Sequence, residues 1–207
     1  MHHHHHHGGS GPRSVEQLEQ IRKQKKAHIR QTALELFAEN GFHATSISQI
    51  SKKAKISKGL IYNYFQSKDE ILEDIFDWAI TTVYSNFDLN KDGMLSTEEF
   101  IHFIRVSLRT TMENRPFWKL YSALVLQPHI LETYTAKYED MGKEIAGMIR
   151  NFIVSQGSVS PDKDLFAISC LLKGANLILI TAPDFFPVEN LEKDTIEACF
   201  KLISKNE

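Results

Sequence analysis

Residues 45–68, TSISQISKKAKISKGLIYNYFQSK, decide how the N-terminal part of this chain folds. Apolar residues recur at helical spacing, stop near Lys55 and restart after Ser57. Ser46 and Ser57 stand where the N-caps of two short helices would lie. The stretch therefore predicts two short helices joined by a tight turn, which is the arrangement of a helix-turn-helix.

The outer face of the second predicted helix has chemistry suited to the major groove of DNA. Lysines supply positive charge, and hydroxyl, phenol and amide groups can hydrogen-bond to phosphates or base edges. Gly59 is costly inside a helix, by about 1 kcal/mol relative to Ala, and close approach of the backbone to DNA would explain it. Two surface helices with a solvated lysine face are the alternative interpretation.

A longer stretch, residues 27–72, resembles the N-terminal DNA-binding domain of the TetR family of bacterial regulators. ALELFAENGF would close a first helix, ATSISQISKKA would form the second, ISKGLIYNYF the recognition helix, and SKDEIL would open a fourth. The resemblance implies an all-α fold, with a three-helix helix-turn-helix domain followed by a helical ligand-binding and dimerisation domain. It implies phosphate contacts for Thr45 and Ser46, and Tyr64 stands where many relatives have a histidine. Together with the residue chemistry, it predicts DNA contacts for Thr45, Ser46, Lys55, Ser57, Lys58, Gly59, Tyr62, Asn63, Tyr64 and Lys68.

Composition divides the chain into three parts. Residues 1–14, MHHHHHHGGSGPRS, have the composition of an affinity tag and linker. Residues 15–67 would form the DNA-binding domain and residues 68–207 the effector-binding and dimerisation domain. No signal peptide is visible, and the longest apolar stretch, residues 177–182, is too short to span a membrane. The two cysteines, Cys170 and Cys199, indicate neither a disulfide framework nor a zinc site, so we expect a cytoplasmic protein with no membrane partner.

Charge is distributed unevenly along the chain. Residues 15–66 contain nine Lys or Arg and four Asp or Glu, a net charge of +5, whereas residues 67–207 contain 14 and 22, a net charge of −8. A basic head suits contact with phosphates, and the acidic body should be repelled by them. Arg22, Lys23, Lys25 and Lys26 precede the expected first helix and could either extend the phosphate footprint or form a solvated, frayed helix start.

The remainder of the chain reads as helical. Periodicity and punctuation predict helices over residues 68–86, 97–113, 117–126, 128–155, 162–181 and 190–204. The segment 165–180, LFAISCLLKGANLILI, is apolar on more than one face and must be covered on both sides. The resemblance implies that the last two helices pair with those of a second subunit to form a homodimer, and a core helix of a monomer is the alternative. The candidate interface residues are Ala167, Cys170, Leu171, Gly174, Ile178, Ile196, Cys199 and Phe200.

Residues 88–99, DLNKDGMLSTEE, fit the calcium-binding loop of an EF-hand at each defining position. The predicted metal ligands are Asp88, Asn90, Asp92, the Met94 carbonyl, Ser96 and Glu99. Ser96 and Glu99 would equally form a helix capping box, and Asp, Asn and Gly are ordinary turn residues. The possible cofactor is Ca²⁺, and the alternative is a capped turn that holds no metal.

The central part of the body would hold an effector pocket if the chain resembles its relatives in this respect. Candidate lining residues are Phe103, Phe117, Trp118, Tyr121, Tyr134, Tyr138, Met141 and Met148. Aromatic residues and methionines at helical spacing are also ordinary core residues. No motif for catalysis is present, so we do not expect an enzyme.

These observations favour a homodimeric, sequence-specific regulator of transcription that binds double-stranded operator DNA. By the resemblance, it would usually be a repressor that an unidentified small-molecule effector releases from the operator. The alternative is a calcium-responsive regulator, or a calcium-binding protein, that uses the loop 88–99.

Overall fold

The computed structural model describes residues 14–85, 87–88 and 90–206, and across these residues the chain is helical with no strand. The helices are α1 (Val15–Asn40), α2 (Ile47–Ala54), α3 (Lys58–Tyr64), α4 (Lys68–Tyr84), α5 (Thr97–Glu113), α6 (Arg115–Val125), α7 (Pro128–Ser155), α8 (Pro161–Thr181) and α9 (Leu191–Lys201), with short 3-10 turns η1 (Pro183–Phe185) and η2 (Val188–Asn190) before α9. The predicted all-α fold is confirmed, and the helix bounds lie close to those expected from periodicity.

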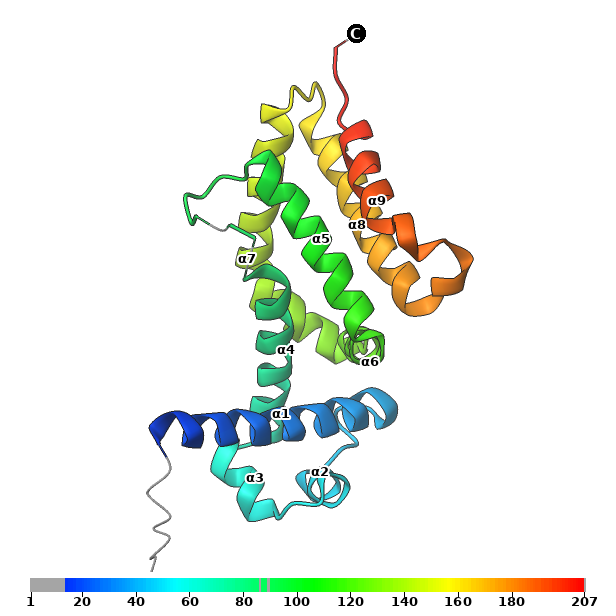
Figure 1. The fold of residues 1–207 in the computed structure, drawn as a ribbon. Helices are drawn as coiled ribbons and strands as arrows, with labels where there is room; N and C mark the ends of the chain where they lie inside the picture. The colour runs from blue at the N-terminus through cyan, green and yellow to red at the C-terminus, as the bar shows by residue number, and fades with distance from the viewer. Residues whose placement is uncertain (1–13, 86, 89, 207) are drawn as a thin grey trace, which may run out of the picture.

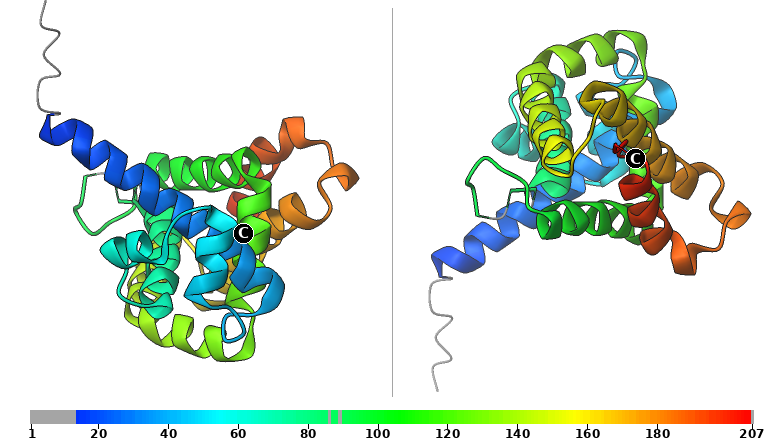
Figure 2. Two further views of the ribbon diagram at one scale, coloured as in Figure 1. Left: turned by 90° about the horizontal axis from the view of Figure 1, so that it is seen from below. Right: turned by 90° about the horizontal axis from the view of Figure 1, so that it is seen from above.

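The helices form a small head and a larger body (Figure 1). In the head, α1 lies across α2 and α3, and α4 rises from the head into the body. Views from below and above place α5, α7, α8 and α9 together as a bundle over the head (Figure 2). Helix α4 is therefore the covalent link between the head and the body.

Serine caps determine where the helices of the head begin. The Ser46 side chain accepts a hydrogen bond from the Gln49 amide, and the Gln49 side chain accepts one from the Ser46 amide, which completes a capping box. The Ser57 side chain accepts a hydrogen bond from the Leu60 amide at the start of α3. Both predicted N-caps are confirmed, and the turn between them needs only the left-handed Lys55 (φ 58°) to reverse the chain.

The first helix begins earlier than expected. Helix α1 starts at Val15, where Ser14 and Gln17 form a capping box, and it runs without a break through the basic residues 22–26. The expectation that these residues precede the first helix was wrong. The capping signal lies at the edge of the tag-like segment and is easily overlooked in the sequence.

Two hydrophobic clusters hold the described residues together. The first joins buried residues of α1, α2 and α3 to α4 and α6, so head and lower body share one core. The second joins α5, α7, α8 and α9. Gln127 adds a polar clasp to the first: its side-chain amide donates to the Phe37 carbonyl (2.7 Å) and accepts from the Phe42 amide (3.1 Å). A movement in the lower body would therefore act on the end of α1 directly.

Helix α8 has an unusually apolar surface. Helix α8 is long and apolar enough to cross a membrane, judged by length and composition alone. Only 22% of its most apolar 18-residue segment is buried within the single chain. It packs on α5, α6, α7 and α9. Phe166 (72% exposed) and Leu177 (54% exposed) lie on its outer side, so apolar surface remains uncovered.

Candidate nucleic-acid interface

Helix α3 presents an exposed polar face at the end of the head. Ser57, Lys58, Gly59 and Asn63 are exposed, and Tyr62 is 50% exposed. The opposite side is anchored by Ile61, which is fully buried in the first core cluster. This alternation keeps the backbone of α3 rigid while its polar side chains stay available to a partner.

Gly59 has no packing reason within the chain. A Cβ built at this position meets nothing closer than the Ser57 hydroxyl oxygen, at 4.0 Å. Since an alanine would fit and would favour the helix, the fold itself does not require glycine here. Close approach of an external surface would require it.

Thr45 differs from its predicted role. Its side chain is buried (2% exposed), and its hydroxyl donates to the carbonyls of Gly41 (2.8 Å) and Leu36 (3.3 Å). The expected side-chain contact with phosphate is therefore wrong, because the hydroxyl is already used to join the end of α1 to the turn before α2. The neighbouring Ser46 is exposed, but its hydroxyl caps α2.

Lys68 also has an internal role that the sequence did not indicate. Its ammonium group donates to the carbonyls of Phe42 (2.7 Å), Thr45 (3.0 Å) and His43 (3.2 Å), and it lies 4.5 Å from the centre of the Phe42 ring. A lysine has three N–H donors, and all three are engaged. The expectation that Lys68 is a free phosphate contact is therefore replaced by a clamp that fixes the turn between α1 and α2.

Helix α1 places two cationic side chains beside α3. They belong to the basic group that we expected only to extend the phosphate contacts of the helix-turn-helix. The Arg22 guanidinium lies 4.8 Å from the Tyr64 ring centre, and the Lys26 ammonium lies 5.2 Å from that of Phe65. Tyr64 is thus half-buried under an arginine, in a cation–π contact. This arrangement brings positive charge from α1 to the end of α3.

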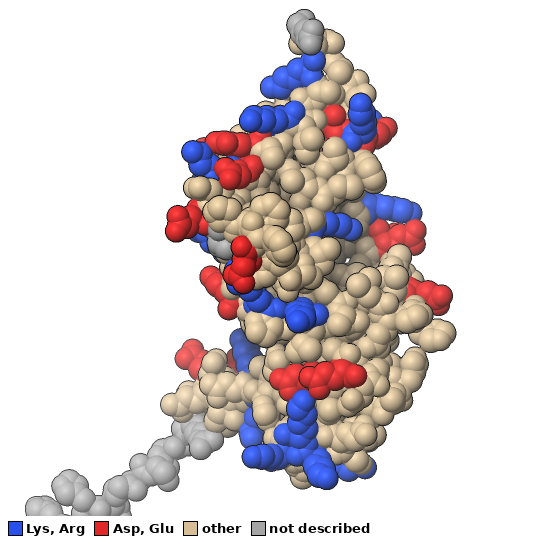
Figure 3. Space-filling view, turned by 90° about the vertical axis from the view of Figure 1, so that its right-hand side faces the viewer, with Lys and Arg blue, Asp and Glu red and all other residues tan. Residues whose placement is uncertain are grey.

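Positive charge concentrates at the lower end of the head in the face drawn in Figure 3, where Lys and Arg side chains gather. Lys52, Lys55 and Lys58 are exposed around the helix-turn-helix. Lys53 differs from them because it forms an ion pair with Glu35 (3.0 Å). Burial opposes ionisation of that carboxyl, but hydrogen bonds from Lys53 and Gln31 lower the pKa of Glu35 below its ordinary value. Lys53 is therefore partly neutralised, and the other three carry the exposed charge.

The predicted effector-pocket residues fall into two separate groups. Phe117 and Tyr121 are buried in the first core cluster, with Trp118, Tyr134 and Tyr138 packed against it. Phe103 belongs to the second cluster. Met141 and Met148 are half-buried on α7. The two hollows described for the chain, about 340 and 300 Å³, are lined by other residues, so the structure does not bring this whole set around one cavity.

Tyr121 and Tyr138 nevertheless have distinctive surroundings. The Tyr138 hydroxyl donates to Asp77 (2.7 Å), and burial together with this carboxylate raises the pKa of Tyr138. The Tyr121 hydroxyl is buried and has no well-formed hydrogen bond among the described residues, and burial together with the neighbouring Tyr134 hydroxyl raises the pKa of Tyr121. A buried hydroxyl without a well-formed hydrogen bond is uncommon and could accept a bond from, or donate one to, a bound polar group.

Comparison with known proteins identifies the head. Residues 29–75, from α1 into α4, match the family model described as bacterial regulatory proteins, tetR family. This part of the chain is therefore similar to the DNA-binding domain of tetR-family regulators. A regulator of Bacillus subtilis, the uncharacterized HTH-type transcriptional regulator YuxN, is 45% identical over 56 residues, which are 27% of this chain and 19% of that protein. The match therefore spans about a fifth of that relative and is confined to one part of each protein.

Other similarities extend beyond the head. An HTH-type transcriptional repressor of Mycobacterium tuberculosis is 26% identical over 126 residues, covering 60% of this chain and 67% of the repressor. A crystal structure of a transcriptional regulator from Aquifex aeolicus has a TM-score of 0.60 and 26% identity, covering 86% of this chain and 99% of that chain. These relatives are named as regulators of transcription, in agreement with the expectation that the protein is not an enzyme.

Proposed function

We propose that this protein is a regulator of transcription of the tetR type that recognises a specific sequence in double-stranded DNA. The observation that carries the proposal is the exposed face of α3, where Lys58, Tyr62 and Asn63 flank a glycine that the fold does not require. Lysine and arginine contribute affinity for phosphates, while tyrosine and asparagine can read base edges. Among the predicted contacts, Ser46 and Ser57 contribute through the helix starts that they cap.

We further propose that the protein acts as a homodimer through α8 and α9. Phe166, Cys170 and Leu177 form an exposed stripe at spacings of four and seven residues on α8. The exposed Lys173 lies on the same face between Cys170 and Leu177. Monomeric proteins rarely leave large apolar side chains such as these uncovered on one helix face, and a second copy of the same helix would cover them. Two heads held in this way would read two half-sites of a pseudo-palindromic operator.

Repression relieved by an effector is the proposed mode of control, in the cytoplasm. The relative from Mycobacterium tuberculosis is named a repressor. The buried Tyr121 hydroxyl lies among the rings of Phe117, Trp118 and Tyr134 and has no well-formed hydrogen bond, so it offers a polar anchor for a small aromatic or apolar molecule. A ligand there would press on α4 and α6, and through the Gln127 clasp on α1, which would change the relative position of the two heads.

The test begins with selection of binding duplexes from a random pool by the full-length protein. We expect Tyr62→Ala to reduce affinity for the selected duplex by about 1–3 kcal/mol and to affect unrelated DNA much less. Lys58→Ala should weaken binding to all duplexes alike and lower the salt slope by about one. Lys163→Ala removes the same charge from an exposed site on the body and serves as the control. Equal binding by the wild-type protein and all three variants would refute the assigned interface.

A further inference from the structure

The connection between α4 and α5 has a composition and geometry that DNA recognition does not explain. It projects from the side of the body (Figure 1), and both its ends are fixed in the second core cluster. Phe87 before it is buried and packs on Phe103 (ring centroids 4.9 Å), and Phe100 after it is buried against Phe152 (4.5 Å). Leu95 inserts from the connection itself into the same cluster. The backbone that carries the polar side chains is therefore held at three points.

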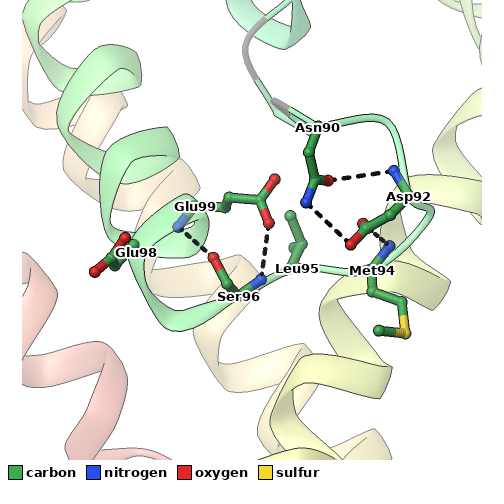
Figure 4. A pocket seen from close by; sticks show the side chains of 7 residues that line it. All are labelled: Asn90, Asp92, Met94, Leu95, Ser96, Glu98 and Glu99. Carbon is green, nitrogen blue, oxygen red and sulfur yellow. Dashed lines mark hydrogen bonds between the residues drawn. The ribbon is translucent and has the colours of Figure 1, made fainter.

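Carboxylates that are distant in the connection converge. One oxygen each from Asp88, Asp92 and Glu99 lies within 4.8 Å of the others. Asn90 lies between Asp92 and Glu99, and its side chain is hydrogen-bonded to Asp92 (Figure 4). These residues occupy positions 1, 3, 5 and 12 of a twelve-residue calcium loop. A hollow of about 340 Å³ beside this cluster is lined by Asn90, Asp92 and Glu99, although not by Asp88.

The Asp88 carboxylate gives an independent observation in favour of a bound cation. Asp88 Oδ2 accepts a hydrogen bond from the Gly93 amide (2.9 Å), whereas Asp88 Oδ1 is buried and has no hydrogen-bond partner among the described residues. Glu99 is also buried, with 6% of its surface exposed. Burial of carboxylate oxygens close to other carboxylates is unfavourable unless a cation or donors compensate. A cation at this place would neutralise the repulsion and satisfy Asp88 Oδ1.

We propose that Asp88, Asn90, Asp92, Ser96 and Glu99, together with the Met94 carbonyl, form a binding site for one calcium ion. All these donors are oxygens, directly or through a water held by Ser96, and Ca²⁺ takes six to eight of them in flexible geometry. The Met94 side chain has no oxygen, so only its backbone carbonyl would contribute. Because Asn90 is neutral and no second such loop stands beside it among the described residues, the affinity should be weak for this motif, with a Kd on the order of 10⁻⁵ to 10⁻³ M.

The competing explanation is that the acidic residues serve only the start of α5. The Ser96 side chain accepts from the Glu99 amide, and the Glu99 carboxylate accepts from the Ser96 amide (both 3.1 Å), which is a complete capping box. The same chain builds this box with glutamine at Gln17 and Gln49. Glutamine at position 99 would therefore preserve the cap and remove only the charge and the two-oxygen ligand.

Calcium binding and capping by Glu99 can therefore be separated by substitution. Calcium chloride is titrated by calorimetry into the full chain and into Glu99→Gln and Glu98→Gln. Glu98 carries the same charge one residue away, is exposed, and is not one of the three carboxylates that converge (Figure 4). Any calcium bound by the histidines of residues 1–14 is common to all three proteins.

We expect one saturable site per chain, weakened at least about tenfold in Glu99→Gln and unchanged in Glu98→Gln. Circular dichroism should give the same helix content for all three proteins. No binding by the wild-type protein at millimolar calcium would overturn the proposal. Equal weakening in both variants would also overturn it, since that result indicates general attraction to acidic residues, and magnesium binding as tight as calcium would refute the assignment to calcium.

Discussion

Replacing Gly59 by alanine should make the protein more stable and a weaker DNA binder at the same time. Glycine in a helix costs up to about 1 kcal/mol relative to alanine, and the new Cβ would lie 4.0 Å from its nearest neighbour, so it creates no clash. The free energy of unfolding should rise by up to about 1 kcal/mol, which corresponds to a Tm increase of roughly 2–4 °C for a chain of this size. Gly59 lies in the first turn of α3, so the lower part of this range applies.

Binding should change in the opposite direction because the added methyl group stands on the exposed face. Forcing a methyl group into a packed interface typically costs about 1–3 kcal/mol, which is a loss of roughly fivefold to a hundredfold in affinity. Thermal unfolding and fluorescence anisotropy with a selected duplex measure the two effects separately.

Gly142→Ala in α7 is the matched control. Gly142 is exposed, lies in a helix interior, and has nothing within 4 Å of a built Cβ. It should stabilise the fold without altering DNA binding. If Gly59→Ala bound the duplex as well as the wild-type protein, the argument that this glycine permits close approach to DNA would be wrong.

Three further predictions concern the clamp, the dimer and the thiols. Lys68→Met should lower the free energy of unfolding by about 1–3 kcal/mol, since three carbonyls lose a charged donor, and an unchanged Tm in thermal melts would contradict the clamp. Phe166→Glu or Leu177→Glu should shift the protein from dimer to monomer in sedimentation equilibrium, and a monomeric wild type at micromolar concentration would refute the proposed interface. Burial raises the pKa of the Cys199 thiol to about 12, so at pH 8 it is a neutral thiol and should resist maleimide until the protein unfolds. Cys170 should be protected in the dimer and react in Leu177→Glu, and equal reactivity in both proteins would count against its place in the interface.

Local features of the head were predictable from the sequence. Caps such as Ser46 and Ser57 act on amides three residues away, so their signal lies within a single turn of sequence. The same holds for the alternation that buries Ile61 and exposes Tyr62. Short-range physics was therefore sufficient for the helix-turn-helix.

Long-range contacts could not be predicted in this way. Lys68 reaches carbonyls 23 to 26 residues away, and Gln127 reaches backbone groups 85 and 90 residues away. Neither side chain has a local pattern that reveals such partners. Thr45 was misassigned for the same reason, because nothing nearby in sequence indicated that its hydroxyl faces inward.

The faces of α8 and α9 were only partly predictable. Cys199, predicted at the dimer interface, is fully buried in the second core cluster, and that prediction was wrong. Phe166 and Leu177 were missed, although they are the most exposed apolar side chains of α8. A helix that is apolar on several sides gives no periodic signal for which side faces the core of its own chain.

The central claim is that the head binds DNA through α3 and its surrounding cations. The most direct test measures the affinity of the full-length protein for a duplex selected from a random pool as a function of salt concentration. The account predicts enrichment of a two-fold symmetric sequence, with log K falling linearly against log salt at about 0.9 per phosphate contact. Failure to enrich any sequence, or an affinity that does not change with salt, would contradict it.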